Sequence, residues 1–246
     1  MEEVTGERIR TAETTIAILE TLTDAPEPLG ATEIARSVDI TKGTAYKHLQ
    51  TLRAYGYVEK NERKYTLSLR FLDVGEHVRM ETGVVELVDE YVDQLANMTD
   101  ETAGFVIERA DRAADIYYAP GSETTPFCTT RHLYCSAAGK ALLAERTPDA
   151  VRNYVSNHEL RPLTENTLVE EAELVDEIRR VRERGMAFER EEQFEGVNSV
   201  ATSVTADACT GAIYVSGTAS ALSGKRFEEN VAGMLLSIAR TMSAEL

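Results

Sequence analysis

The spacing of apolar residues over residues 12–67 predicts three helices followed by a β-hairpin. In the third helix, Ala45, Leu49 and Leu52 recur at the period of one helical face. Thr41 stands before this helix as a candidate N-cap, and Gly56 follows it where a positive φ is favourable. Two earlier apolar stripes predict the other helices, the second of them capped by Gly30; they are Ala12, Ile16, Leu19 and Leu22, then Ile34, Ala35 and Val38.

The hairpin is predicted from two strand-like runs, residues 57–60 and 64–67, on either side of a polar turn at 61–63. Three helices followed by a basic hairpin are typical of a winged helix-turn-helix, which binds double-stranded DNA. Lys and Thr near a helix N-terminus suit phosphates and base edges, and Gln50 is suited to pair with adenine. The candidate DNA-binding residues are Lys42, Gly43, Thr44, Tyr46, Lys47, Gln50, Arg63 and Lys64.

A second interpretation of these polar side chains stays open. Each of them singly can be part of a solvated helix face that binds nothing, and helix-turn-helix shapes also occur in proteins that do not bind DNA. His48 is expected to pack against its own domain instead of contacting DNA.

The apolar pattern after the hairpin predicts a connecting helix and then an α+β domain. Leu67, Phe71, Val74 and Val78 predict a linker helix over residues 68–83, which Gly83 ends. The later periods predict a helix over 84–98, a hairpin within 102–118, helices from Ser136 and Pro148 and within 164–184, strands at 186–190, 197–204 and 211–217, and a closing helix over 227–242. We therefore expect three parts: a winged domain at 8–67, a linker helix at 68–83 and an α+β sensor domain at 84–246.

The composition is that of a folded protein outside the membrane. Hydrophobic residues make up 43% of the 246 positions. No apolar run reaches the eighteen or so residues of a membrane span, so no membrane partner is expected. The acidic N-terminus lacks the apolar segment of a secretory signal, which predicts a cytoplasmic location.

The net charge of −16 argues against DNA binding until it is divided along the chain. Residues 1–72 carry ten basic and eleven acidic side chains, whereas residues 73–246 carry sixteen and thirty-one. Four of the six lysines lie in the third predicted helix and the hairpin. The acidity, with arginine used more than lysine, indicates adaptation to high salt, as in a halophile. Counterion release contributes little there, so base and shape contacts have to supply more of the affinity for DNA.

Cys128, His132 and Cys135 are the candidate metal ligands. They are four and three residues apart, and Cys and His are good zinc ligands. The spacing fits no standard zinc site, and a buried cysteine usually packs as a small apolar residue. No hydrolase serine motif, zinc-protease motif or phosphate-binding glycine loop is present. We predict no metal, no cofactor and no catalytic residue, while the metal interpretation of these three residues stays open.

Four segments carry a more specific pattern: Thr41–Leu49 with Tyr55–Val58, Cys135–Ala144, Gly185–Ala201 and Ile213–Gly217. Each is weak alone, but together they resemble the IclR family of transcription regulators over nearly the whole chain. The sequence departs from the family pattern at the ligand end: Glu189 replaces Asp, Ser203 replaces Pro, and Thr205 and Ala206 replace an aromatic–Asp pair.

The resemblance implies a winged helix-turn-helix joined by a helix to a GAF-like effector domain. It implies homodimers or homotetramers that bind palindromic operators and change their DNA affinity when a small organic acid or related metabolite binds. It places the effector among residues at a helix start, on the sheet and in its apolar surroundings, namely Ala137, Ala138, Glu189, Ser199, Tyr214, Ser216, Leu133 and Phe105.

Physical chemistry supports an anion at this helix start, because small side chains there expose backbone N–H groups. The alternative is that the small residues only allow close packing of helix and sheet. A carboxylate at Glu189 repels an anionic ligand but accepts a hydrogen bond from a sugar hydroxyl, which favours a polyol or sugar-acid effector.

These observations predict an effector-responsive transcription regulator that controls a carbon catabolic pathway. Two alternatives remain. One is a metabolite or metal sensor that acts through protein contacts and leaves no footprint on DNA. The other is an enzyme within residues 84–246, which no constellation of residues requires.

Overall fold

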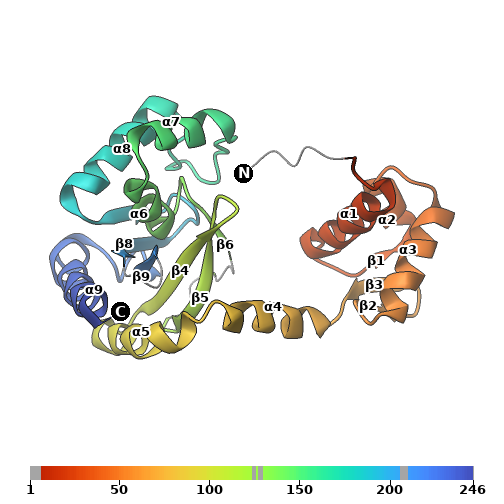
Figure 1. Cartoon of the computed structure of the whole chain (residues 1–246), viewed down its shortest axis with the longest axis horizontal. Coiled ribbons are helices and arrows are strands. Elements are labelled where there is room, and N and C mark those ends of the chain that lie inside the picture. Colours follow the sequence, from red (N-terminus) through yellow and green to blue (C-terminus); the bar gives the residue numbers. More distant parts are fainter. Residues whose placement is uncertain (1–6, 124–125, 127–129, 206–209, 246) are drawn as a thin grey trace. The chain divides into compact units, whose positions relative to one another are not determined.

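The chain folds as two units that divide between Glu81 and Thr82. The computed structural model describes residues 7–123, 126, 130–205 and 210–245. Figure 1 shows the small N-terminal unit with its wing, in red and orange, and the larger C-terminal unit built on one sheet. No helix in the described part of the chain is both long and apolar enough to cross a membrane.

The N-terminal unit is a winged helix-turn-helix, as the sequence predicts. Its helices are α1 Arg10–Asp24, α2 Ala31–Ser37, α3 Lys42–Ala54 and α4 Arg70–Glu81. Its strands are β1 Leu29–Gly30, β2 Val58–Asn61 and β3 Lys64–Leu67. The three strands pair antiparallel in the order β1-β3-β2, so β1, which the sequence pattern does not predict, adds an edge to the wing.

Local capping explains where α2 and α3 begin. Thr41 Oγ1 accepts a hydrogen bond from the backbone N–H of Thr44 at 3.1 Å. Glu33 Oε2 accepts one from the backbone N–H of Gly30 at 2.7 Å. Gly56, just after α3, has a φ of 78°, which L side chains rarely adopt. The predicted caps and the predicted positive φ are confirmed.

The inward face of α1 differs from the predicted one. Ile18 is fully buried and Leu22 is nearly so, whereas Ile16 is 55% exposed and Ala12 is also exposed. The face that packs on α2 and β3 runs through Thr15, Ile18 and Leu22, at i, i+3 and i+7. Thr15 is polar, so a search for regularly spaced apolar residues does not recognise this face and predicts the neighbouring one instead.

The helix predicted as a linker is α4, and it buries none of its residues. Ser68 Oγ accepts a hydrogen bond from the backbone N–H of Arg70 at 3.2 Å, which marks the start of the helix. Phe71 contacts the ring of Tyr57, with ring centroids 5.2 Å apart. Val78 is 58% exposed, so the predicted apolar stripe is not an inward face of this unit.

The C-terminal unit is built on one antiparallel sheet. Its strands are β4 Thr102–Arg109, β5 Arg112–Ala119, β6 Thr130–His132, β7 Ala187–Arg190, β8 Val197–Thr205 and β9 Thr210–Thr218. They pair in the order β6-β5-β4-β9-β8-β7. The tight turn between β4 and β5 places Ala110 and Asp111 at positive φ, 49° and 58°. The hairpin predicted within 102–118 is confirmed.

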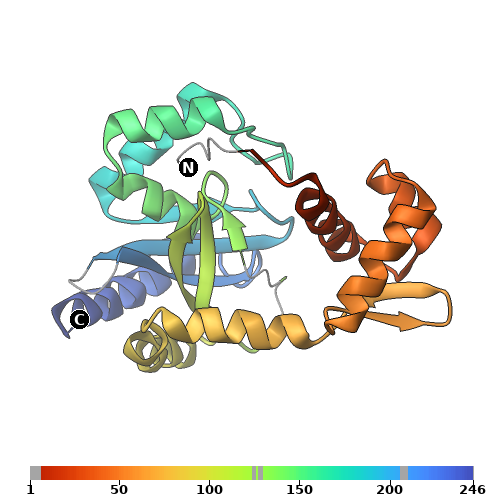
Figure 2. The ribbon, with the colours of Figure 1, turned by 45° about the vertical axis from the view of Figure 1, so that its right-hand side comes forward.

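Helices cover both faces of this sheet (Figure 2). One face carries α5 Val85–Thr99, the π-helical turn η1 Arg226–Val231 and α9 Ala232–Glu245. The other carries α6 Ala137–Glu145, α7 Pro148–Asn157 and α8 Glu171–Arg184. The sheet therefore separates two cores, and the predicted α+β class is confirmed.

Neighbouring residues of one strand enter different cores. Val200 and Ile213 pack with α5 and α9, whereas Ala201 and Tyr214 pack with α6, α7 and α8. This follows from the alternation of side chains along a strand. The alternation decides which of the predicted effector residues meet.

Ile18→Ala is expected to destabilise the N-terminal unit by about 2–4 kcal/mol, because it removes a fully buried side chain from a small core. Ile16→Ala on the same helix should lower the unfolding free energy by less than about 1 kcal/mol, because Ile16 is already half exposed. Denaturant unfolding followed by circular dichroism measures both variants against the parent chain. Equal losses in the two variants would contradict the inward face described for α1.

Candidate functional site

The polar residues predicted for DNA binding share the solvent side of α3. Lys42, Gly43, Tyr46 and Lys47 are exposed, while Ala45, Leu49 and Leu52 on the opposite side are buried. Thr44 and Gln50 are half-buried at the edges of this exposed face. Neither Lys42 nor Lys47 forms an ion pair with another described residue, so their charges face solvent or a partner.

Two side chains of α3 are already engaged within the unit. The hydroxyls of Thr44 and Thr41 lie 2.9 Å apart, so Thr44 takes part in the helix cap. His48 Nδ1 lies 2.8 Å from Thr15 Oγ1 and ties α3 to α1. The expectation that His48 packs within its own domain is confirmed.

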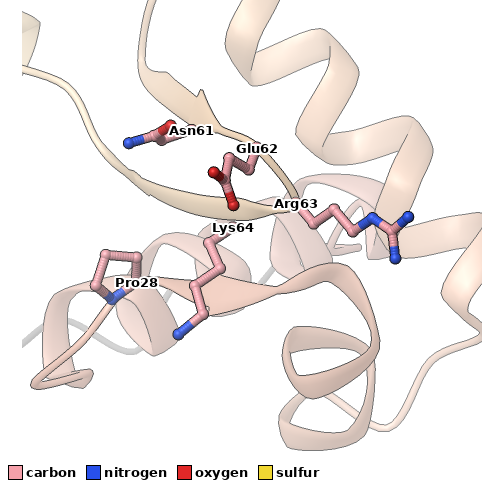
Figure 3. A pocket seen from close by; sticks show the side chains of 5 residues that line it. All are labelled: Pro28, Asn61, Glu62, Arg63 and Lys64. Atoms are coloured by element: carbon pink, nitrogen blue, oxygen red, sulfur yellow. The ribbon is translucent and has the colours of Figure 1, made fainter.

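The wing presents a shallow groove lined by Pro28, Asn61, Glu62, Arg63 and Lys64 (Figure 3). Arg63 and Lys64 extend from the hairpin in different directions. Glu62, at a φ of 54°, occupies the turn and adds a carboxylate to the lining of the same groove. Pro28 lines the groove because the adjacent strand β1 pairs with β3, with Leu29 opposite Tyr65. A Pro-x-Gly run after the first helix is the sequence signal for this extra edge.

A second depression borders the start of α3. It is lined by side chains from α1, from the turn before α3 and from α3 itself, namely Arg10, Thr11, Thr14, Asp39, Ile40, Thr41, Thr44 and His48. Sequence reasoning does not select Arg10, Thr11 or Thr14. They lie on the polar side of α1, and the apolar spacing of that helix predicts only its packing face.

In the C-terminal unit, seven of the eight predicted effector residues share the core beside α6. Glu189, Ser199, Tyr214 and Ser216 come from β7, β8 and β9, and their strand positions alternate with those that enter the opposite core. Leu133, Ala137 and Ala138 belong to the same core.

Phe105 is the exception, and its expected place beside the others is wrong. It is fully buried in the opposite core, against α5 and α9. Gly104 pairs with Tyr214 across β4 and β9, so the next residue, Phe105, points to the other face with Ile213.

Tyr214 is held in a closed polar network. Its hydroxyl donates to Asp115 Oδ1 at 2.7 Å and accepts from Arg131 Nη2 at 2.9 Å. Arg131 Nε also donates to Asp115 Oδ2 at 3.0 Å, and the guanidinium lies over the tyrosine ring at 4.5 Å. A Cβ at Gly104 would overlap the Tyr214 ring, so glycine makes room for the network. The Tyr214 hydroxyl is thus engaged in holding the network and is not offered to a ligand.

Ser136 caps α6 and shapes its first turn. Ser136 Oγ accepts from the backbone N–H of Gly139 at 3.1 Å and donates to the carbonyl of His132 at 2.6 Å. A Cβ at Gly139 would overlap the backbone of Leu133, so close packing does explain this glycine. The cap uses the N–H of Gly139, and the N–H groups of Ala137 and Ala138 have no partner within the helix.

Two carboxyls and one ammonium are buried near this helix start. Lys140 Nζ donates to Glu192 Oε1 at 2.6 Å. Glu189 Oε1 accepts from the backbone N–H of Gln193 at 3.1 Å, and burial raises the pKa of Glu189 to about 7. Sequence reasoning does not select Lys140 or Glu192. Lys140 has a signal, because it is the one charged residue of the otherwise small and apolar segment 135–144, whereas Glu192 lies among several other charged residues that hide it.

Ser199 and Ser216 face each other across β8 and β9. Ser199 Oγ donates to Ser216 Oγ at 3.1 Å, and both side chains are buried. Ser199 also acts on Glu189 by a side-chain hydrogen bond that opposes the rise of its pKa. The predicted polar residues of the sheet therefore form one connected group.

The candidate metal ligands do not assemble within the described residues. Cys128 lies outside them, and Cys135 is a buried free thiol. His132 Nδ1 lies 2.8 Å from Arg112 Nη1, and burial together with Arg112 and Arg161 lowers the pKa of His132 to about 4. Among the described residues, no three His, Cys, Asp or Glu side chains are grouped as a metal site requires.

A winged helix-turn-helix followed along the chain by an α+β unit with a buried polar group is the architecture of a ligand-responsive DNA-binding protein. Residues 76–244 match the family model "Bacterial transcriptional regulator IclR C-terminal", and residues 11–62 match the "IclR helix-turn-helix domain". The chain belongs to the IclR family of transcriptional regulators, which are not enzymes.

Relatives and a solved structure agree with this assignment. The chain is 31% identical over 200 residues to the DNA-binding transcriptional repressor YiaJ of Escherichia coli, covering 77% of this chain and 70% of YiaJ. It is 29% identical over 237 residues to the E. coli regulator KdgR, covering 93% and 89%. An IclR homologue from Microbacterium hydrocarbonoxydans, solved with 4-hydroxybenzoate, has the same fold at a TM-score of 0.77 and 14% identity, covering 96% and 98%.

Glu189→Gln is expected to stabilise the protein at pH 8 by on the order of 1–3 kcal/mol and to change little near pH 5. The folded pKa of about 7 lies above the usual 4.5, so the folded state keeps a proton that the unfolded chain loses. Stability therefore falls as pH rises between these values, and the neutral amide removes that loss. Denaturant unfolding at the two pH values measures it. Glu195→Gln, an exposed neighbour, is the control, and an equal effect of Glu189→Gln at both pH values would contradict the buried carboxyl.

Proposed function

We propose that this regulator binds palindromic operator DNA as a homodimer or homotetramer and changes its DNA affinity when a small organic acid or sugar acid binds. In this proposal it acts in the cytoplasm and controls genes of a carbon catabolic pathway. The observation that carries the DNA part is the polar side of α3, where exposed Lys42, Tyr46 and Lys47 and half-buried Gln50 lie opposite a buried apolar face.

The charge distribution supports contact through this face. The acidity of the chain lies almost wholly in residues 73–246, while residues 1–72 are close to neutral. Lys42, Lys47, Lys60 and Lys64 concentrate positive charge on α3 and the wing. With weak long-range attraction, specific base contacts from Lys47 and Gln50 carry much of the discrimination.

The proposed homodimer implies a palindromic operator. A single recognition helix reads only a few base pairs, and two copies in a twofold dimer read two half-sites. The two helices then meet successive major grooves about 34 Å apart, or a multiple of that spacing.

The effector proposal rests on the connected group beside α6. The first-turn N–H groups of Ala137 and Ala138 suit a carboxylate. Ser199 and Ser216 add hydroxyls, and Glu189 adds an acceptor that favours a hydroxyl-bearing ligand. The Microbacterium homologue was solved with 4-hydroxybenzoate, a small organic acid, and this supports a ligand of the acid class.

The proposed response couples the effector unit to DNA binding. In sequence, α4 is the only helix between the winged elements and α5, so a change at the effector site reaches the wing through this connection. A coupling of about 1–3 kcal/mol is typical of such regulators and changes DNA affinity roughly 5–150-fold.

Footprinting of the tagged protein on chromosomal DNA in cells, in native salt, tests the function directly. We expect a few sharp sites that share an inverted repeat and lie near genes of one pathway. A lack of enrichment under several carbon sources would contradict DNA regulation and favour a sensor that acts through protein contacts.

Lys47→Ala combined with Gln50→Ala is expected to weaken binding to the selected operator about 10–100-fold and to reduce discrimination between operator and random DNA. The reason is that the double variant removes one cation and one adenine-reading amide from α3. Fluorescence anisotropy at fixed salt measures both affinities. Lys225→Ala with Gln94→Ala, which makes the same chemical changes on exposed positions of the other unit, is the control. An unchanged operator affinity in the α3 variant would refute the assigned recognition face.

A further inference from the structure

Glu192 carries a buried oxygen that makes no hydrogen bond among the described residues. Its Oε1 accepts from Lys140 Nζ at 2.6 Å, and only one-tenth of its side chain is exposed. Its Oε2 is buried and accepts no hydrogen bond. Buried polar atoms nearly always have a partner, so an unused carboxylate oxygen in a native core indicates a group that arrives from outside.

The surroundings of Glu192 do not satisfy this oxygen. Burial raises the pKa of Glu192, while Lys140 and the backbone N–H of Arg190 act against that rise. The N–H of Arg190 nevertheless makes no hydrogen bond of ordinary geometry to Oε2. Lys140 is committed to Oε1, so no donor within the described chain serves Oε2.

Glu192 lies next to the proposed effector residues. Its partner Lys140 stands in α6 three residues after Ala137, the first residue of that helix. Glu192 also follows β7 in the same short turn that returns to Glu189 through the N–H of Gln193. Lys140 lowers and Glu192 raises the pKa of Glu189 through their charges.

This turn is held from outside by a second segment. Thr164 Oγ1 donates to the carbonyl of Glu191 at 2.6 Å, and Thr167 Oγ1 donates to the carbonyl of Glu192 at 2.7 Å. These bonds fix the backbone that carries Glu192. The unused Oε2 is therefore part of a fixed arrangement and not of a loose surface loop.

The residues around Glu192 include both hydrogen-bond acceptors and donors. Glu192 Oε2 and the carboxyl of Glu189 accept hydrogen bonds, whereas the N–H groups of Ala137 and Ala138 donate them. A ligand that matches both has several hydroxyl groups and one carboxylate. A plain aliphatic acid has no donor for either glutamate, and a phenolic acid has one.

We propose that Glu192 is an effector-binding residue, and that the effector is a polyhydroxylated carboxylic acid with a hydroxyl that donates to Glu192 Oε2. Its carboxylate meets the N–H groups at the start of α6, and a second hydroxyl meets Glu189. This inference rests on the effector response proposed above and names the chemical class of the ligand.

Isothermal titration of the full-length protein with four acids tests the ligand class. Gluconate and galactonate carry the hydroxyls, hexanoate has the same number of carbons without them, and 4-hydroxybenzoate has one phenolic hydroxyl. We expect at least one of the two hydroxylated acids to bind tenfold or more tightly than hexanoate and 4-hydroxybenzoate. Equal or tighter binding of either comparison acid, or no binding of gluconate and galactonate, would overturn the inference.

Glu192→Gln tests the residue. The amide keeps an oxygen for Lys140 but replaces the second acceptor by a donor, so affinity for the preferred hydroxylated acid should fall tenfold or more. Glu195→Gln, three residues further on and exposed, should bind that acid like the parent chain. Thermal unfolding confirms that each variant is folded. Unchanged affinity in folded Glu192→Gln overturns the assignment, and if this variant does not fold, the acid series on the parent chain decides.

An electrophoretic shift with the selected operator separates the two proposals. Failure to bind any operator refutes the proposed function, whatever the acids do. Operator binding without affinity for gluconate or galactonate refutes only the ligand class.

Discussion

The register of β8 against β9 determines which side chains the C-terminal unit can offer to a ligand. Ser199 lies opposite Ser216, and Ala201 lies opposite Tyr214. Since both faces of the sheet are buried, a slip of one residue would move the serines into the apolar core beneath α5 and α9. The pairing of β8 with β9 thus decides which polar side chains lie together, as well as how the core packs.

Two buried polar groups on that face differ in how completely they are satisfied. In the first, Arg131, Asp115 and Tyr214 each use the others, and Gly104 leaves the space they need. A closed network of this kind is rigid and supports its surroundings. In the second, Lys140 and Glu192 pair but leave one oxygen unused. The two groups therefore differ in that only the Lys140–Glu192 pair leaves a buried oxygen without a hydrogen bond among the described residues.

The uneven charge of the two units bears on how such a regulator finds DNA. An acidic effector unit weakens attraction to DNA at a distance, and the few lysines on α3 and the wing act mainly once contact is made. Such an arrangement favours binding that depends on the base sequence over loose binding to any duplex. The arrangement also suits high salt, where exposed charges interact over only short distances.

Much of the fold follows from the sequence because its signals are local. Thr41 and Gly56 mark the ends of α3, Gly185 with a φ of 74° ends α8, and strand alternation marks the hairpins. These features depend on residues a few positions apart, and the same is true of the exposed lysines on α3. Apolar spacing predicts three parts, a winged domain, a linker helix and an α+β domain, whereas the structure groups the linker helix α4 with the N-terminal unit.

Tertiary packing decided what depends on residues far apart. The inward face of α1 includes Thr15 because His48 of α3 meets it there, and a polar residue hides that face from any apolar pattern. Phe105 lies outside the candidate site because β4 pairs with β9 in a register that places it opposite Ile213. This register joins residues far apart in the sequence, so no local pattern predicts it. Lys140 and Glu192 lie 52 residues apart, and only the packing of α6 against the turn after β7 makes them one buried pair. The sequence by itself determined the elements and the helix that carries the exposed lysines, whereas the tertiary structure decided which polar groups are buried together, because burial and pairing arise only between distant parts of the chain.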